Sequence, residues 1–260
     1  MTDRSTMRPA PLPQAPEPRR RLGMFALIAL LAAGGAAVAY AATDKAGIAG
    51  TDRAAIEEVV RSYILEHPEI IPEAVKRLQA REMAQKIEDN RAVLETPYKG
   101  AWEGAAKPDV TLVAFMDYAC GYCRASLPDL ARLVKEDSGL RVVYRELPII
   151  AEGSAGAARV SMLAAEGSHY MAFHKAMYAA GDVEPATVLK VAGKVGLDAA
   201  KARAAIGNKA GDEEIMDNVR LAQAIDATGT PTFVVGNQVL TGAVGYEALK
   251  AAIAEARKKG

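Results

Sequence analysis

The sequence is poor in cysteine and histidine, with two cysteines and three histidines among 260 residues. A four-cysteine zinc site would need a second cysteine pair, and a Cys2His2 site would need histidines at finger-like spacing, whereas His169 follows Cys123 by 46 residues. A structural zinc site is therefore disfavoured, and no metal site is predicted. His169 and His174, together with the scattered methionines, are assigned to packing or to the surface.

The chain also lacks net charge, because 32 Lys plus Arg balance 32 Asp plus Glu. No basic stripe with interleaved aromatic residues occurs, so nucleic acid is not an expected partner. Half of the residues are hydrophobic and a quarter are charged, as in an ordinary globular protein. The length is sufficient for one sizeable domain with additions.

Residues 1–43 have the pattern of an export segment. A proline-rich leader ends in Arg19, Arg20 and Arg21, and an uncharged stretch follows at 22–42. In a helix those 21 residues span about 31 Å, close to a hydrocarbon core of about 30 Å, so the stretch can remain as a membrane anchor. Residues 39–41 also fit a cleavage site. The positive-inside rule then places everything after the stretch in the periplasm, free or tethered to the inner membrane.

Two helices are predicted over the next segment, 44–95. Apolar residues recur at three- and four-residue steps between Ile56 and Ile64, and Pro68 interrupts the pattern. Pro72 can start a second helix, which runs to Leu94 with a densely charged face. Two helices of this size bury little apolar surface alone, so we expect them to pack on the main domain or on copies of the chain.

The rest of the chain predicts an α/β domain. Residues 96–107 contain one proline and two glycines and are predicted to be a linker. The expected elements of residues 108–260 are a strand at 110–116, a helix at 122–135, a strand at 140–147, a helical stretch at about 154–227, a hairpin at 232–240 and a helix at 246–257. This order predicts a central mixed sheet with helices on its faces and a helical insertion, preceded by the N-terminal helical arm.

The two cysteines form one motif, Cys120-Gly121-Tyr122-Cys123, between the first strand and the first helix. A disulfide that encloses two residues removes little chain entropy, so a structural staple explains the pair poorly and a redox dithiol explains it better. A thiolate at Cys120 would accept hydrogen bonds from the free N–H groups that begin the helix. Cys123, one turn further, is expected to be shielded.

The segment Phe115–Cys123, with Thr230-Pro231-Thr232-Phe233 downstream, resembles the DsbA-like thiol-disulfide oxidoreductases of the thioredoxin superfamily. Residues 62–74 are similar to the N-terminal segment of the ScsC-type (suppressor of copper sensitivity) members. The resemblance implies a thioredoxin fold, Cys120 as nucleophile, Cys123 as resolving thiol and Pro231 as a cis-proline facing them. No cofactor other than the redox-active Cys120–Cys123 disulfide is implied. In some members the arm drives trimerisation and accompanies isomerase activity, which makes residues 51–95 a candidate trimerisation segment; other members are monomeric.

The sequence departs from the family pattern in two ways. Many members carry an acidic residue six positions before the first cysteine, where it can exchange the proton of the buried thiol, but this chain has Ala114 there. Asp117 could substitute, although a cap for the helix is the favoured role. The dipeptide Gly121-Tyr122 lacks the histidine of the most oxidising relatives, which favours a less extreme potential.

The sequence thus predicts an exported thiol-disulfide interchange protein that acts on other exported proteins. The candidate site residues are Cys120 and Cys123 as the catalytic pair, Thr230 and Pro231 as substrate-binding residues, and Asp117, Gly121 and Tyr122 as supporting residues. The alternative is copper(I) binding by the same two thiolates. The direction of exchange stays open, because an oxidase is recharged by a membrane redox partner protein, whereas an isomerase is kept reduced and shields several sites in one oligomer.

Overall fold

The computed structural model describes residues 50–207 and 212–259, and the predicted export segment lies outside them. None of the helices in these ranges has the length and apolar content that a membrane crossing needs. The chain divides into two units, Met1–Ile71 and Pro72–Gly260.

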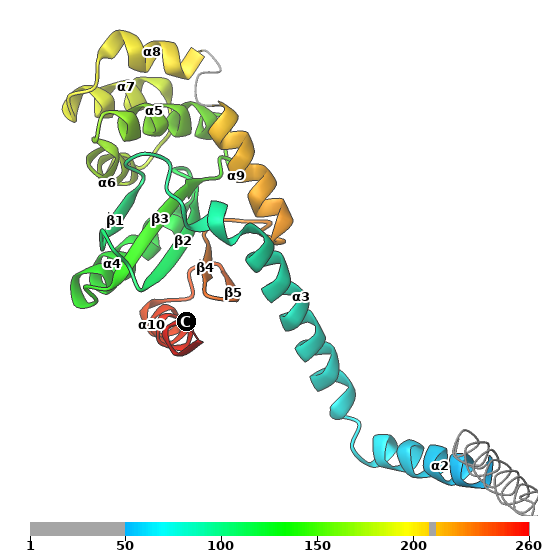
Figure 1. Ribbon diagram of the computed structural model, residues 1–260. Helices are drawn as coiled ribbons and strands as arrows, with labels where there is room; N and C mark the ends of the chain where they lie inside the picture. Colours follow the sequence, from blue (N-terminus) through cyan, green and yellow to red (C-terminus); the bar gives the residue numbers. More distant parts are fainter. Residues whose placement is uncertain (1–49, 208–211, 260) are drawn as a thin grey trace, which may run out of the picture. The chain divides into compact units, whose positions relative to one another are not determined.

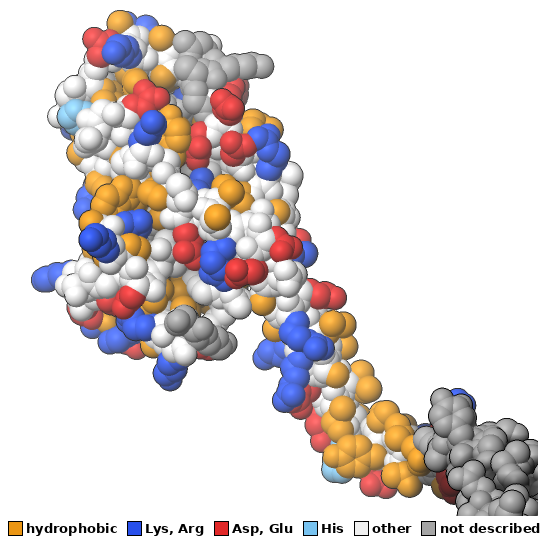
Figure 2. All heavy atoms as spheres, viewed as in Figure 1, with side chains coloured by type: hydrophobic (Ala, Val, Ile, Leu, Met, Phe, Trp, Pro, Cys, Tyr) orange, Lys and Arg blue, Asp and Glu red, His pale blue; other side chains and the backbone are white. Residues whose placement is uncertain are grey.

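Helix α2 (Gly50–Glu66) is the described helix that lies wholly in the first unit. It ends where His67 donates its N–H to the carbonyl of Tyr63 at 2.9 Å, just before Pro68, as the sequence predicts. Five of its large apolar side chains are between 48% and 69% exposed and appear as a hydrophobic surface in Figure 2. These exposed residues are Ile56, Val59, Val60, Tyr63 and Leu65. The helix therefore has no core of its own.

Helix α3 (Ile70–Glu95) follows, with Pro72 in its first turn, where a missing N–H costs nothing. The residues from Pro72 onward belong to the second unit. Near the end of the helix, Ile87 and Leu94 are fully buried against residues of the sheet. The last part of the predicted arm therefore packs on its own domain.

The second unit is built on a five-stranded mixed sheet in the order β1-β3-β2-β4-β5 (Figure 1), as predicted. Strand β2 (Val110–Met116) is parallel to β3 (Leu140–Glu146) and antiparallel to β4 (Thr232–Val235). Strand β5 (Gln238–Thr241) completes the predicted hairpin with β4. Strand β2 is buried along its whole length, because both faces of the sheet are covered.

One expectation is corrected at the edge of the sheet. The segment 96–107, predicted to be a linker, contains strand β1 (Trp102–Gly104), which pairs antiparallel with β3. Three residues are too few to show the alternation that identifies a strand. Gly104 is required there, because its φ is +96° and a Cβ would lie 2.3 Å from the carbonyl oxygen of Leu140.

Helices cover the sheet and form the predicted insertion. The helices of the second unit after α3 are α4 (Gly121–Glu136), α5 (Ser154–Glu166), α6 (Tyr170–Ala180), α7 (Pro185–Lys194), α8 (Ala199–Gly207), α9 (Asp212–Ala224) and α10 (Tyr246–Lys259). Helices α5 to α8 contact one another as a group between β3 and β4 in the chain (Figure 1). Apolar residues of alternate parity on β2 enter two separate cores, one with α4 and α6, the other with α3 and α9.

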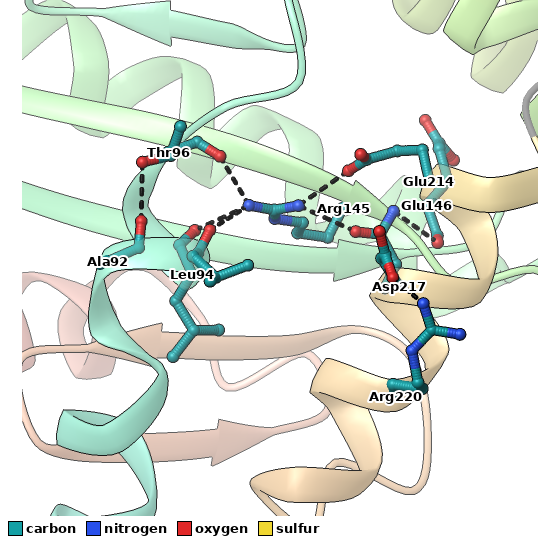
Figure 3. A network of polar contacts seen from close by, with 10 residues as sticks. Ala92, Leu94, Thr96, Arg145, Glu146, Glu214, Asp217 and Arg220 are labelled. Carbon is teal, nitrogen blue, oxygen red and sulfur yellow. Dashed lines mark hydrogen bonds and ion pairs between the residues drawn. The ribbon is translucent and has the colours of Figure 1, made fainter.

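A buried arginine connects three elements of the second core (Figure 3). Arg145 of β3 is 3% exposed and donates to Glu214 at 2.8 Å and Asn218 at 3.0 Å, both on α9. Its other terminal nitrogen donates to carbonyl oxygens at the end of α3, those of Val93, Leu94 and Thr96. These are carbonyls that a helix end leaves without intrahelical partners.

Candidate active site

The dithiol lies where the sequence predicts, at the carboxyl end of β2 and the start of α4. Cys120 is the N-cap residue of α4, and its sulfur accepts the N–H of Cys123 at 3.4 Å. Both thiols are free. A sulfur at this position receives a hydrogen bond and lies at the positive end of the helix dipole.

The two sulfurs differ in access. Cys120 is 5% exposed, whereas Cys123 is fully buried in the core beneath α4. Burial raises the pKa of the Cys123 thiol well above its usual value, against the opposing hydrogen bond from the Asp117 backbone. The expectation that Cys123 is shielded is confirmed.

The loop that carries Thr230 and Pro231 meets Cys120. The Thr230–Pro231 peptide bond is cis, as predicted. In the dithiol form the Cys120 thiol donates to the Thr230 carbonyl oxygen at 3.2 Å. The Pro231 carbonyl accepts the N–H of Gly242 at 2.8 Å. Loss of the Cys120 proton would remove the donor and release the Thr230 carbonyl.

Asp117 does not cap α4, and that prediction is wrong because Cys120 fills the N-cap position. Its buried carboxylate instead organises two loops. One oxygen accepts from the Ala119 N–H at 2.8 Å and the Ser154 hydroxyl at 2.7 Å. The other accepts the N–H groups of Ile149 and Ile150 at 2.7 and 2.8 Å. A side chain with this many donors fixes the loop after β3 beside the loop that precedes the dithiol.

Exposed apolar side chains lie at the start of α4 and on the loop after β3. Tyr122, between the cysteines, is 71% exposed, and Ile149 and Ile150 are about half exposed. A Cβ on Gly121 would meet nothing within 4 Å, so steric need does not explain that glycine. Sequence reasoning missed the two isoleucines, although their place directly after a strand and Pro148 was the available signal.

Sequence reasoning also missed Glu146, the last residue of β3, which is 1% exposed. One carboxylate oxygen accepts from the hydroxyls of Tyr118 at 2.9 Å and Tyr170 at 2.8 Å, and the other is buried without a hydrogen-bond partner. Burial raises the pKa of Glu146 to about 7. The available signal was a charged residue at a core-facing position, in phase with Val142 and Tyr144.

His174 has the packing role that the sequence predicts. It is fully buried on α6, and its ring lies against the tyrosines of the first core. Its Nδ1 lies 3.2 Å from the Tyr118 hydroxyl, and burial lowers the pKa of its imidazole to about 3. Throughout residues 50–207 and 212–259, no three His, Cys, Asp or Glu side chains are grouped so that they could hold a metal ion.

Two protein-family models match the chain. The model described as DSBA-like thioredoxin domain matches residues 111–254. The model described as copper resistance protein ScsC N-terminal domain matches residues 52–85. Among curated proteins, the Na(+)/H(+) antiporter NhaA 3 of Salinispora tropica is 30% identical over 156 residues, which are 59% of this chain and 24% of the antiporter. The chain thus spans about a quarter of the length of that curated relative.

Solved structures are similar as well. A thioredoxin-like oxidoreductase from Silicibacter pomeroyi is 37% identical, with a TM-score of 0.58 over 60% of this chain and 91% of that one. A linker-deletion and point mutant of Proteus mirabilis ScsC is 22% identical, with a TM-score of 0.63 over 83% of this chain and 100% of that one. At the second identity the likeness concerns the fold.

Proposed function

Since the chain belongs to the family of DsbA-like thioredoxin domains, with an ScsC-type N-terminal segment, we propose that it exchanges disulfides with other exported proteins through Cys120 and Cys123. The family is one of thiol-disulfide oxidoreductases, and the resemblance expected from Phe115–Cys123 is confirmed. One observation supports the assignment of roles to the two cysteines. Cys120 at the start of α4 is slightly exposed, whereas solvent does not reach Cys123.

The chemistry follows from this difference in access. A substrate thiolate attacks the Cys120 sulfur of the disulfide, the Cys120–Cys123 bond breaks, and Cys123 leaves as a thiolate that takes up a proton. A second substrate thiolate then attacks the substrate sulfur of the mixed disulfide and releases Cys120 as a thiolate. Two electrons pass from the substrate dithiol to the pair. Run in reverse, the same steps reduce a substrate disulfide, with Cys120 as nucleophile and Cys123 as resolving thiol.

Substrate binding is proposed at the surface around Cys120. The Thr230 carbonyl is released when Cys120 loses its proton, and it can then accept a hydrogen bond from an extended chain beside Pro231. Tyr122, between the two cysteines, and Ile149, on the loop after β3, are exposed and offer apolar contacts. This arrangement suits an unfolded segment with apolar residues flanking its cysteine.

Export is proposed from the segment 1–43, with periplasmic location and a tether at 22–42. Disulfides form and persist in that compartment. A membrane redox partner would return the pair to its working state. Fractionation of cells that produce the protein checks this proposal, and recovery in the cytosolic fraction would contradict it.

Self-association through the arm, as a trimer, is proposed from α2. Five of its large apolar side chains are about half exposed or more, and the ScsC N-terminal model matches this segment. The substitutions Val59→Ser and Tyr63→Ser should lower the native mass measured by light scattering to that of a monomer. Glu58→Gln, on the same helix, is the matched control. A wild-type monomer without activity on a scrambled multi-disulfide substrate would remove the isomerase alternative.

The central test is turnover. Cys120→Ala should reduce insulin reduction and scrambled-substrate refolding to the uncatalysed rate, because the thiol that remains, Cys123, is buried and does not reach a substrate. Cys123→Ala should accumulate a mixed disulfide on Cys120, visible by mass spectrometry, because the resolving thiol is absent. Full activity of Cys120→Ala contradicts the proposed function.

Copper(I) binding by the two thiolates is the second candidate, and the description of the matched N-terminal model favours testing it. The complete burial of Cys123 opposes it, because a shared metal must reach both sulfurs. A sub-stoichiometric copper(I) titration against a competing chelator separates the candidates. Tight one-to-one copper(I) binding, together with no disulfide-exchange turnover, would favour copper binding over the proposed exchange function.

A further inference from the structure

Glu146 is a buried acid that the exchange steps above do not use. In the parallel pairing of β3 with β2 it lies opposite Met116, and Ala114 lies opposite Tyr144. Strand alternation places Glu146 and Tyr144 on one face. A buried acid thus lies on the strand next to Ala114, two residues closer to the edge that carries the dithiol.

The hydrogen-bond donors to the Glu146 carboxylate are neutral hydroxyl groups. The Tyr118 hydroxyl has one proton and donates it to Glu146, so its contact with His174 requires Nδ1 of the imidazole to donate. The imidazole itself is neutral, because burial lowers its pKa to about 3. The titratable and charged groups that face Glu146 are Asp117 and Tyr118 from the loop after β2, Tyr144 from β3, and Tyr170, His174 and Tyr178 from α6. Polar groups come from Ser161 of α5 and Asn218 of α9.

The cationic neighbour in the sequence does not neutralise it. The side chain of Arg145 lies on the opposite face of the sheet, where it is paired with Glu214. The negative charge of Asp117 acts in the same direction as burial and disfavours ionisation of Glu146. When Glu146 is ionised, its negative charge is therefore not compensated inside a water-excluded core.

The same core contains the resolving cysteine. Cys123 and Tyr118 belong to one buried cluster, and the Tyr178 ring lies 4.9 Å from the Tyr118 ring. The Tyr178 hydroxyl donates at 3.0 Å to the Asp117 carbonyl, which also accepts the N–H of Cys120. Burial raises the pKa of Tyr178, and Cys123 and Glu146 lie close enough to raise it further when they are ionised. One phenol is thus within electrostatic range of both the acid and the dithiol.

We propose that Glu146 is a positioning residue that tunes the oxidising strength of the dithiol through its charge. An ionised Glu146 opposes the thiolate of the reduced pair and favours the disulfide, whereas a protonated Glu146 does not. The pair is therefore a stronger oxidant when Glu146 is protonated. Because the pKa of Glu146 is raised to about 7, the change falls near neutral pH. This inference rests on the proposed function for its role in exchange.

The first test is a redox titration against glutathione. Two glutathione thiols give up two electrons and two protons and form one disulfide, while the Cys120–Cys123 bond breaks. At pH 8.5, Glu146→Gln should shift the equilibrium constant toward the dithiol by about fivefold to tenfold, where tenfold is about 30 mV for a two-electron couple. At pH 5.5 the equilibrium constants of the wild type and the variant should agree within about twofold, because the side chain at position 146 is then uncharged in both proteins.

The control variant removes the same negative charge at a different position. Glu152→Gln removes the same charge from an exposed residue of the loop after β3 and should leave the constant unchanged at both pH values. A shift of Glu146→Gln that is equal at both pH values would indicate lost packing and overturn the inference, as would no shift at pH 8.5. The titration needs no protein substrate, so failure of the proposed function in turnover assays is distinguished from failure of this inference.

A second measurement uses the wild-type protein and does not depend on the variant folding. The carbon-13 resonance of the Glu146 carboxyl, followed by NMR against pH, should titrate near pH 7 and at a higher midpoint in the reduced protein than in the oxidised protein. The thiolate and the carboxylate oppose each other reciprocally. Equal midpoints in the two redox states would overturn the inference.

Discussion

Arg145 and Glu146 are neighbours on β3 that serve opposite faces of the sheet. Both are almost completely buried. Arg145 uses both terminal nitrogens to join α3, β3 and α9, whereas Glu146 leaves one carboxylate oxygen without a partner beside the dithiol core. Buried charges that are paired hold elements together, and a buried acid without a counter-ion stays sensitive to pH. One strand therefore carries a structural charge on one face and a titratable charge on the other.

The largest expected effect on stability comes from removing Arg145, the structural charge. Arg145→Ala should lower the free energy of unfolding by about 3 kcal/mol or more, because Glu214 and the carbonyls at the end of α3 lose their donor inside the protein. Urea unfolding measures it. Arg220→Ala, on the exposed surface of α9, is the control and should change stability by less than about 0.5 kcal/mol. Equal effects of the two variants would refute the structural role of Arg145.

The second effect concerns the titratable side. The pKa of Glu146 is higher in the folded protein, about 7, than in the unfolded chain, so the folded state binds the proton more tightly. The contribution of Glu146 to stability is therefore fully present below about pH 4.5 and is lost as the pH rises through 7, by about 1 to 3 kcal/mol. The difference between wild type and Glu146→Gln, measured by urea unfolding across this range, isolates it. A difference that does not vary with pH would contradict the assignment.

The smallest expected effect on stability concerns a hydrogen bond to Glu146. Tyr170→Phe removes one of the two hydroxyl donors to Glu146 and should cost about 1 kcal/mol at pH 5.5. The cost should be larger at pH 8.5, up to about 2 kcal/mol, because the acceptor is then ionised and hydrogen bonds to charged groups are stronger. Thermal unfolding at the two pH values is the measurement. A cost that is the same at both would indicate that the acceptor does not titrate.

Much of the fold was open to prediction from local sequence. The break at Pro68, the strand before the cysteines and the hairpin at 232–240 each rest on residues adjacent in the chain, and the structure confirms them. Strand β1 was missed because its three residues take their conformation from pairing with β3 rather than from their own pattern. The predicted role of Asp117 was wrong for a related reason, since three of its four donors come from residues more than 30 positions away.

By itself, the sequence determined the family, the mixed α/β architecture and the place of the dithiol, because these follow from residue type, spacing and periodicity along the chain. Only the tertiary structure decided that Cys120 faces the Thr230 carbonyl, that Asp117 organises loops, and that Glu146 at the end of β3 is a buried acid. Each depends on which strands become neighbours and on how completely water is excluded between them. Burial and proximity across the sheet are properties that no short segment carries on its own.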